Sequence, residues 1–135
     1  MESISELISR ARAAQAEFEK TATQESVDAI VKAIAKTVYE NAEPLAKLAA
    51  EESGMGLYED KINKNKGKAR IIWSFLKDKK SVGVISRDDR TCITEVARPM
   101  GVVAAITPCT NPIVTPMCNA MYAIKGRNAI IIAPH

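Results

Sequence analysis

The residues best suited to chemistry lie in one short loop, 107–112, with the sequence Thr-Pro-Cys-Thr-Asn-Pro. Two prolines restrict its backbone, while Thr110 and Asn111 carry short hydroxyl and amide groups that donate hydrogen bonds. Donors held in a fixed loop can stabilise negative charge on a substrate oxygen or bind the polar groups of a nucleotide. The same residue types also fill ordinary turns. Taken alone, the loop is therefore more often a structural turn than a site.

Few other side chains are reactive. The three cysteines, at positions 92, 109 and 118, form an odd set without CxxC spacing, which argues against a disulfide framework or a zinc site and favours a reducing compartment. The only histidine available as a base is His135, the last residue, whose side chain we expect to be frayed. We therefore interpret Cys109 as a small buried hydrophobe rather than a nucleophile.

The charge pattern excludes several classes of partner. Nineteen Lys and Arg against 16 Asp and Glu give a net charge of +3, which is too mild to indicate nucleic acid or a membrane. No apolar run approaches the ~20 residues of a membrane span, and no signal peptide is evident, so we expect a cytoplasmic protein. Seven lysines lie between Lys61 and Lys80 beside Trp73 and Phe75. They could bind nucleic acid or coenzyme A phosphates, but we predict a solvated helix face.

Helical periodicity fills the first part of the chain. Apolar residues recur at three-and-four spacing, which predicts helices over 4–18, from a Thr21-x-x-Gln24 cap to Asn41, from Pro44 to Gly54, and over 62–76. On the fourth helix the apolar stripe, which includes Ala69, lies apart from a lysine face at positions 61, 64 and 68.

Strand patterns follow. Alternating segments at 82–85 and 92–96 predict a small antiparallel pair. Continuous apolar runs at 102–106 and 129–133, with a helical stretch near 117–124 between them, predict a buried βαβ unit. The expected fold is α/β: N-terminal helices, an antiparallel strand pair and the first βαβ of a Rossmann-like domain, truncated after two strands. Loop 107–112 then follows the carboxyl end of a parallel strand, where open α/β sheets bind ligands.

Several segments together carry a resemblance to a known family. Segments 99–103, 106–112, 125–131 and 133–135 resemble the aldehyde dehydrogenase superfamily, and 51–56 followed by 59–61 is similar to its CoA-acylating branch, especially the aldehyde-oxidising half of bifunctional aldehyde-alcohol dehydrogenases. Matching segments in the same order are more specific than any one of them. On this resemblance, 1–135 is the N-terminal part of the NAD-binding domain, and 82–98 contributes to an oligomerisation sheet of a homo-oligomer.

The resemblance also implies an activity. A cysteine outside this chain would attack a small aldehyde, the thiohemiacetal would give hydride to NAD, and coenzyme A would take the acyl group; in reverse, the enzyme would reduce an acyl-CoA. The implied oxyanion donor is Asn111, although the register of the family also allows Thr110. The implied cofactor residues are Ile106, Thr107, Pro108 and Thr110 on the nicotinamide side, and Ala133, Pro134 and His135 near the adenine ribose. Non-acylating relatives usually have lysine where Ala133 stands.

A different class of function stays open. The amphipathic first helix could dock on a partner, which would make the chain a non-catalytic assembly module. Packing of this helix on the βαβ unit would explain the same apolar stripe. The sequence does not identify the aldehyde, and it does not decide between NAD and NADP.

Overall fold

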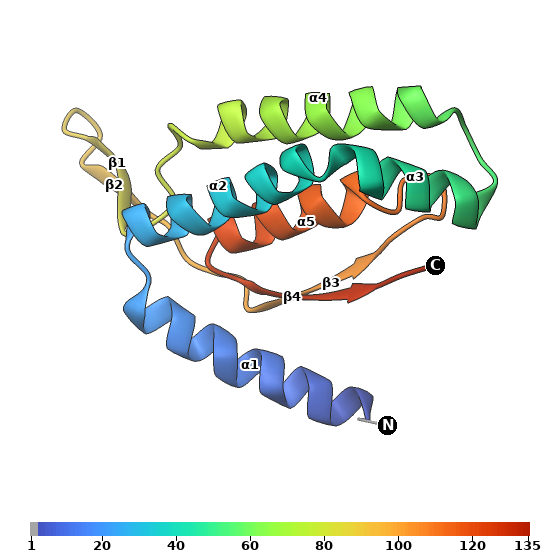
Figure 1. Ribbon diagram of the computed structural model, residues 1–135. Helices are drawn as coiled ribbons and strands as arrows, with labels where there is room; N and C mark the ends of the chain where they lie inside the picture. Colours follow the sequence, from blue (N-terminus) through green and yellow to red (C-terminus); the bar gives the residue numbers. More distant parts are fainter. Residues whose placement is uncertain (1–2) are drawn as a thin grey trace.

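A computed structural model of the protein describes residues 3–135 and builds them in layers around a two-stranded parallel sheet (Figure 1). Strands β3 (Val102–Ile106) and β4 (Ala129–Ala133) pair in parallel, with Val102 opposite Ala129 and Ile106 opposite Ala133. Helix α5 (Val114–Lys125) connects them. The predicted βαβ connection and strand bounds are confirmed, although the helix begins earlier than expected and only Ala105 of the two strands is fully buried within this chain. The carboxyl ends of both strands therefore meet at one edge.

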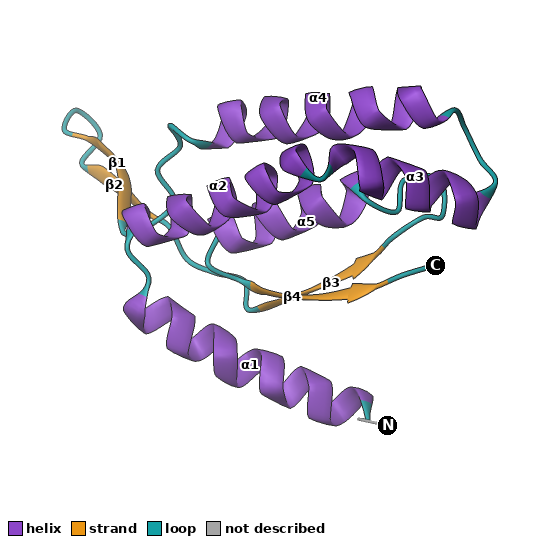
Figure 2. Cartoon of the chain, viewed as in Figure 1, coloured by secondary structure: helices purple, strands orange, loops and turns teal. Residues whose placement is uncertain are grey.

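Helices cover both faces of this sheet. Helix α1 lies against one face and contacts both strands, while α5 lies against the other and is covered in turn by α2 and α4 (Figures 1 and 2). Helix α3 continues from α2 and packs beside α4. None of these described helices is long and apolar enough to cross a membrane. Their bounds are α1 Ile4–Thr21, α2 Gln24–Glu40, α3 Ala42–Ser53 and α4 Tyr58–Leu76.

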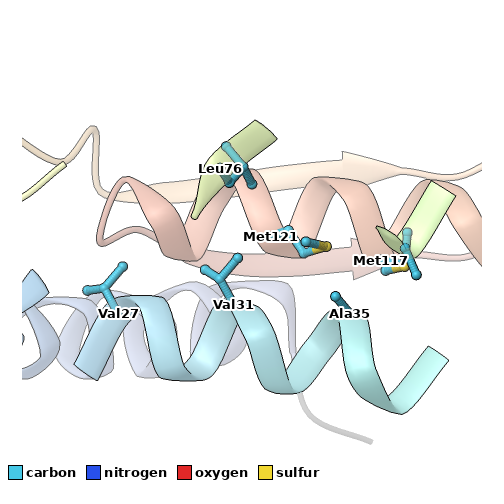
Figure 3. Close-up of a cluster of buried hydrophobic side chains, with 7 residues drawn as sticks. Val27, Val31, Ala35, Leu76, Met117 and Met121 are labelled. Atoms are coloured by element: carbon cyan, nitrogen blue, oxygen red, sulfur yellow. The ribbon is translucent and has the colours of Figure 1, made fainter. Parts of the chain in front are cut away.

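The hydrophobic core lies between α2, α4 and α5 rather than within the sheet. Val27 and Val31 of α2 and Met121 of α5 are completely buried and face one another (Figure 3). Leu76 of α4 closes the cluster from the third side. Because buried apolar area is the main source of stability, this cluster fixes α5 relative to α4, and with it the loop at the start of α5.

Short-range hydrogen bonds decide where the helices begin and end. At α1, the Ser3 hydroxyl accepts from the Glu6 N–H at 3.2 Å and the Glu6 carboxylate accepts from the Ser3 N–H at 2.7 Å, which is a capping box. The predicted cap at Thr21 is wrong, because Thr21 ends α1 and the extended Thr23 caps α2 instead. Gly54 ends α3 at φ 62°, as predicted from its tolerance of the left-handed region.

The antiparallel pair forms a hairpin that projects from the helical body (Figure 1). Strand β1 (Val84–Asp88) pairs with β2 (Ile93–Val96). The pair is confirmed, but its first strand lies further along the chain than predicted, because the Asp88 carboxylate accepts from the Arg90 N–H at 2.9 Å and so starts the turn.

Candidate functional site

Loop 107–112 joins the carboxyl end of β3 to the N-terminus of α5 and is anchored at both ends. The Thr107 N–H donates to the Ala133 carbonyl at 3.0 Å, which extends the sheet by one residue, and Thr107 is 5% exposed. At the other end, the Asn111 carbonyl accepts from the Thr115 N–H at 3.3 Å. Asn111 therefore stands directly before the first turn of α5, at the positive end of the helix dipole.

The Asn111 side chain has a defined orientation. Its amide oxygen accepts a hydrogen bond from the Lys64 ammonium at 2.7 Å. Because lysine donates and never accepts, the atom that faces Lys64 must be the oxygen, and the amide nitrogen must lie on the other side. That nitrogen is 3.4 Å from the Thr110 hydroxyl, and within residues 3–135 it makes no second hydrogen bond. One of its two N–H groups is thus available to a ligand.

A crevice opens beside the loop, where both parallel strands end. Its volume is about 310 Å³, within the range of small-molecule sites. The last turn of α3 forms one wall through Glu52 and Ser53. The opposite wall combines the loop with the end of the chain, through Thr107, Pro108, Cys109, Pro112, Pro134 and His135. Four of the predicted cofactor residues meet here, namely Thr107, Pro108, Pro134 and His135.

The other predicted residues lie elsewhere. Ile106 is 85% exposed and Ala133 is also exposed, and neither lines the crevice. Thr110 and Asn111 line a separate small cavity on the α4 side, together with Lys61 and Lys64. The structure therefore divides the predicted site into a crevice at the strand ends and a polar pair beside α4, and these adjoin because Pro112 lines both.

Two of the four lysines of α4, Lys61 and Lys64, are less exposed than the sequence predicted. Lys61 is 6% exposed and Lys64 is half-buried, so the predicted solvated lysine face is wrong for both, whereas Lys68 is exposed as expected. The sequence does contain a pattern that indicates burial of Lys61. Steps of four residues backward from buried Ala69 reach Asn65 and then Lys61, and all three are buried. The stripe continues into polar residues.

The cysteines occupy three different environments. Cys109 is half-buried in the wall of the crevice. Cys118 is half-buried on α5, and burial raises the pKa of its thiol, an effect that the charge of Lys68 partly opposes. Cys92 is exposed at the hairpin turn with φ 57°. All three thiols are free, so none contributes a disulfide to the site.

Comparison with known proteins shows which family the chain resembles. The aldehyde dehydrogenase family model matches residues 1–135. The succinate-semialdehyde dehydrogenase (acetylating) of Clostridium kluyveri is 57% identical over 133 residues, which cover 98% of this chain and 29% of that protein. The bifunctional aldehyde-alcohol dehydrogenase AdhE of Escherichia coli K12 is 42% identical over 129 residues, covering 96% of this chain and 14% of that protein.

Solved structures also indicate the aldehyde dehydrogenase family. The crystal structure of an acetylating aldehyde dehydrogenase from Geobacillus thermoglucosidasius superimposes with a TM-score of 0.90 at 43% identity, covering 95% of this chain and 28% of that one. The chain thus spans less than a third of the length of each of these relatives. Because the family model matches all 135 residues and the fold agrees, the chain belongs to the aldehyde dehydrogenase family.

Proposed function

We propose that this chain is the N-terminal part of the NAD-binding domain of a CoA-acylating aldehyde dehydrogenase, and that it supplies part of the cofactor site and an oxyanion-stabilising loop. The reaction would convert a short-chain aldehyde, CoA and NAD reversibly to an acyl-CoA and NADH. The observation that carries the proposal is the Asn111 amide, which stands at the carboxyl edge of a parallel strand with an N–H group available.

The chemistry asks this chain to stabilise negative charge. When a cysteine thiolate from another part of the enzyme attacks the aldehyde carbon, the carbonyl oxygen gains charge as its π bond breaks. The Asn111 amide would donate a hydrogen bond to that oxygen, and the N-terminus of α5 would add a favourable potential. Such donors act in the transition state more than in the ground state, so they raise the turnover number.

The crevice at the strand ends fits part of a dinucleotide. It lies where open α/β sheets bind nucleotides, and Thr107, Ser53 and His135 offer polar atoms among apolar proline and alanine walls, the mixture common in cofactor sites. We place the nicotinamide side near Thr107 and Pro108 and the ribose side near Pro134 and His135. A bound dinucleotide would supply the hydride acceptor. The role of the chain would be to orient it beside Asn111.

We further propose that segment 82–98 joins an oligomerisation sheet of a homo-oligomer. Val84, Ile93 and Val96 are between 49% and 58% exposed on the projecting hairpin. A two-stranded hairpin is marginal alone and presents unpaired edges, so pairing with another copy would cover both the edges and the apolar side chains. The parallel sheet also has outer edges without partners in 3–135, which is typical of a sheet that further strands extend.

The assembly-module alternative gains no support. Helix α1 contacts β4 and β3, and the Gln15 amide donates to the Arg127 carbonyl at 3.3 Å. Leu7 and Ala11 line the same surface pocket as Ile130 and Ile132. The apolar stripe of α1 therefore already has a surface within this chain.

The decisive experiment replaces Asn111 with Ala in the full-length protein. We expect kcat for acetaldehyde with NAD and CoA to fall by about 10²–10³, the usual effect of removing an oxyanion donor, while the Kd for NAD changes little. NADH absorbance gives kcat and fluorescence titration gives Kd.

Thr110→Ala is the companion variant, since the two residues are neighbours and the family register allows either. A severe Thr110 effect with a mild Asn111 effect would move the oxyanion role to Thr110 or to backbone N–H groups. Normal kcat per active site in both variants would refute the proposed role of the loop. A structural turn residue would lower thermal stability instead of turnover.

A further inference from the structure

The small cavity lined by Thr110 and Asn111 is also lined by Lys64, which has no role in the reaction as proposed so far. Lys64 is half-buried on α4, whose fully buried residues are Lys61, Asn65, Ala69 and Leu76. Its ammonium extends to the loop that follows β3 and bonds Asn111, 47 positions along the chain. Ordering a long lysine side chain costs rotamer entropy. The hydrogen bond to Asn111 must therefore offset this cost.

The contact determines which end of the Asn111 amide faces the site. An isolated asparagine amide can turn over about its last torsion, since that torsion is broad and roughly two-fold, and the two orientations exchange an N–H donor for an acceptor at the same place. A cation accepts only the oxygen orientation. An acceptor turned toward a developing oxyanion would repel it, so the orientation decides between stabilisation and destabilisation.

The contact also strengthens the donor. Hydrogen bonds from charged donors are stronger than neutral ones, and chains of hydrogen bonds polarise one another. Lys64, the Asn111 amide and a substrate oxygen would form such a chain, with positive charge at one end and the developing negative charge at the other. Lys61 is buried in the same cavity but makes no hydrogen bond to the loop among residues 3–135, whereas Lys64 does.

We propose that Lys64 is a positioning residue of the oxyanion site, which holds the Asn111 amide with its oxygen toward α4 and its nitrogen toward the reacting carbonyl. This inference rests on the proposed function of Asn111. On this proposal, Lys64 does not touch the substrate but controls the orientation of the Asn111 amide, which does.

The test compares variants in the full-length protein with acetaldehyde, NAD and CoA. Lys64→Met keeps the length and apolar stem of the side chain but removes the donor and charge, and should lower kcat by about 10- to 100-fold, the usual cost of losing a residue that orients a catalytic group. The Kd for NAD and the melting temperature should change little. Lys64→Arg, which also donates without accepting, should restore most of the lost turnover.

Lys66→Met is the matched control. Lys66 lies on the same helix, and its ammonium also makes one bond, to the Glu43 carboxylate at 3.0 Å, but at the surface. Its kcat should stay at the wild-type value, since exposed ion pairs contribute little.

The double variant Lys64→Met with Asn111→Ala separates action through Asn111 from independent action. If Lys64 works only by orienting Asn111, the double variant should be no slower than Asn111→Ala alone. Multiplicative losses would overturn the inference, and so would a Lys64→Met enzyme that matches Lys66→Met, or one that loses melting temperature but keeps kcat per active site. Those outcomes leave the proposed function standing. A normal kcat in Asn111→Ala would instead remove both this inference and the proposed oxyanion role of Asn111.

Discussion

Asn128 fixes the start of β3 against the start of β4, and replacing it with Ala should destabilise the fold that aligns the site. Its amide oxygen accepts from the Met100 N–H at 2.6 Å and from the Gly101 N–H at 2.9 Å. Its amide nitrogen donates to the Ala123 carbonyl at 3.2 Å, and the residue is 8% exposed. One buried side chain thus joins α5, β4 and the segment that enters β3.

The loss of stability in Asn128→Ala depends on which backbone groups lose their hydrogen-bond partner. The Ala123 carbonyl keeps its bond from the Asn128 backbone N–H at 2.9 Å, so its loss is small. The N–H groups of Met100 and Gly101 lose the only acceptor that they have within residues 3–135, and each unsatisfied buried group costs about 1–3 kcal/mol. Because Met100 is 91% exposed, water can reach part of this region. We expect a loss of about 2–4 kcal/mol in the free energy of unfolding.

Urea unfolding of the 135-residue chain measures this free energy, and hydrogen exchange at the Met100 and Gly101 amides reports the local effect. Asn119→Ala is the control: Asn119 lies on α5, is half-buried, and makes no hydrogen bond within the described residues, so it should change stability by under ~0.5 kcal/mol. Gly126→Ala gives independent support, because its Cβ would lie 2.8 Å from the Asn128 amide nitrogen and displace it. Equal losses in Asn128→Ala and Asn119→Ala, with unchanged exchange, would refute the reasoning.

Four further outcomes are expected. Asp28→Ala should lower the free energy of unfolding by about 2–4 kcal/mol, because it leaves the ammonium of Lys125, whose side chain is 6% exposed, without its carboxylate. Lys125→Met should cost less, because Asp28 is 24% exposed and keeps a bond from a glutamine amide; the opposite order in denaturation midpoints would contradict this. Burial raises the pKa of the Cys118 thiol, so a smaller fraction of Cys118 is thiolate than in an exposed cysteine at the same pH. Iodoacetamide should therefore modify Cys118 more slowly than exposed Cys92. Mass spectrometry should show that the two rates become equal in urea, where the chain is unfolded. Ile93→Lys in the full-length protein should shift its mass in light scattering to smaller assemblies, and an unchanged mass would argue against the hairpin interface. The isolated 135-residue chain should form no NADH from acetaldehyde, NAD and CoA, since the proposed nucleophile lies outside it; turnover that Cys109→Ser abolishes would reverse that assignment.

The βαβ unit was predictable because its signals are local. Five consecutive apolar residues at 102–106 and again at 129–133 have few alternatives to buried parallel strands, and the structure reproduces both ranges. Helix starts were harder. Thr21, Thr23 and Ser26 are all capable caps, and only the extended backbone at Thr23 (φ −98°, ψ 166°) shows which one begins α2. Propensity identifies the candidates, whereas the backbone conformation at the end of α1 selects Thr23.

The site was predictable only in part, because its components come from distant segments. Loop 107–112 follows directly from the strand before it, so its place at the carboxyl edge could be predicted. The wall formed by Glu52 and Ser53 depends on how α3 packs, and no periodicity in α3 indicates it. Ile106 lies on the exposed side of β3, because side chains alternate along a strand and its neighbours Ala105 and Thr107 are buried; its contact with the cofactor stays a prediction.

The contact between Lys64 and Asn111 could not be predicted from the sequence alone, although physical chemistry limits the partners that a buried lysine can have. Periodicity assigns faces of a helix, but it does not say which face meets another element, so a lysine pattern at 61, 64 and 68 is equally consistent with solvent and with a buried site. Buried lysines, however, are rare without a partner. The buried side of α4 runs from Ala69 through Asn65 to Lys61. A lysine next to this buried side, such as Lys64, should therefore face a hydrogen-bond acceptor from another segment. The acceptor found is the amide oxygen of Asn111. The same contact that buries part of Lys64 therefore fixes the amide oxygen of Asn111 toward α4 and leaves the amide nitrogen on the other side.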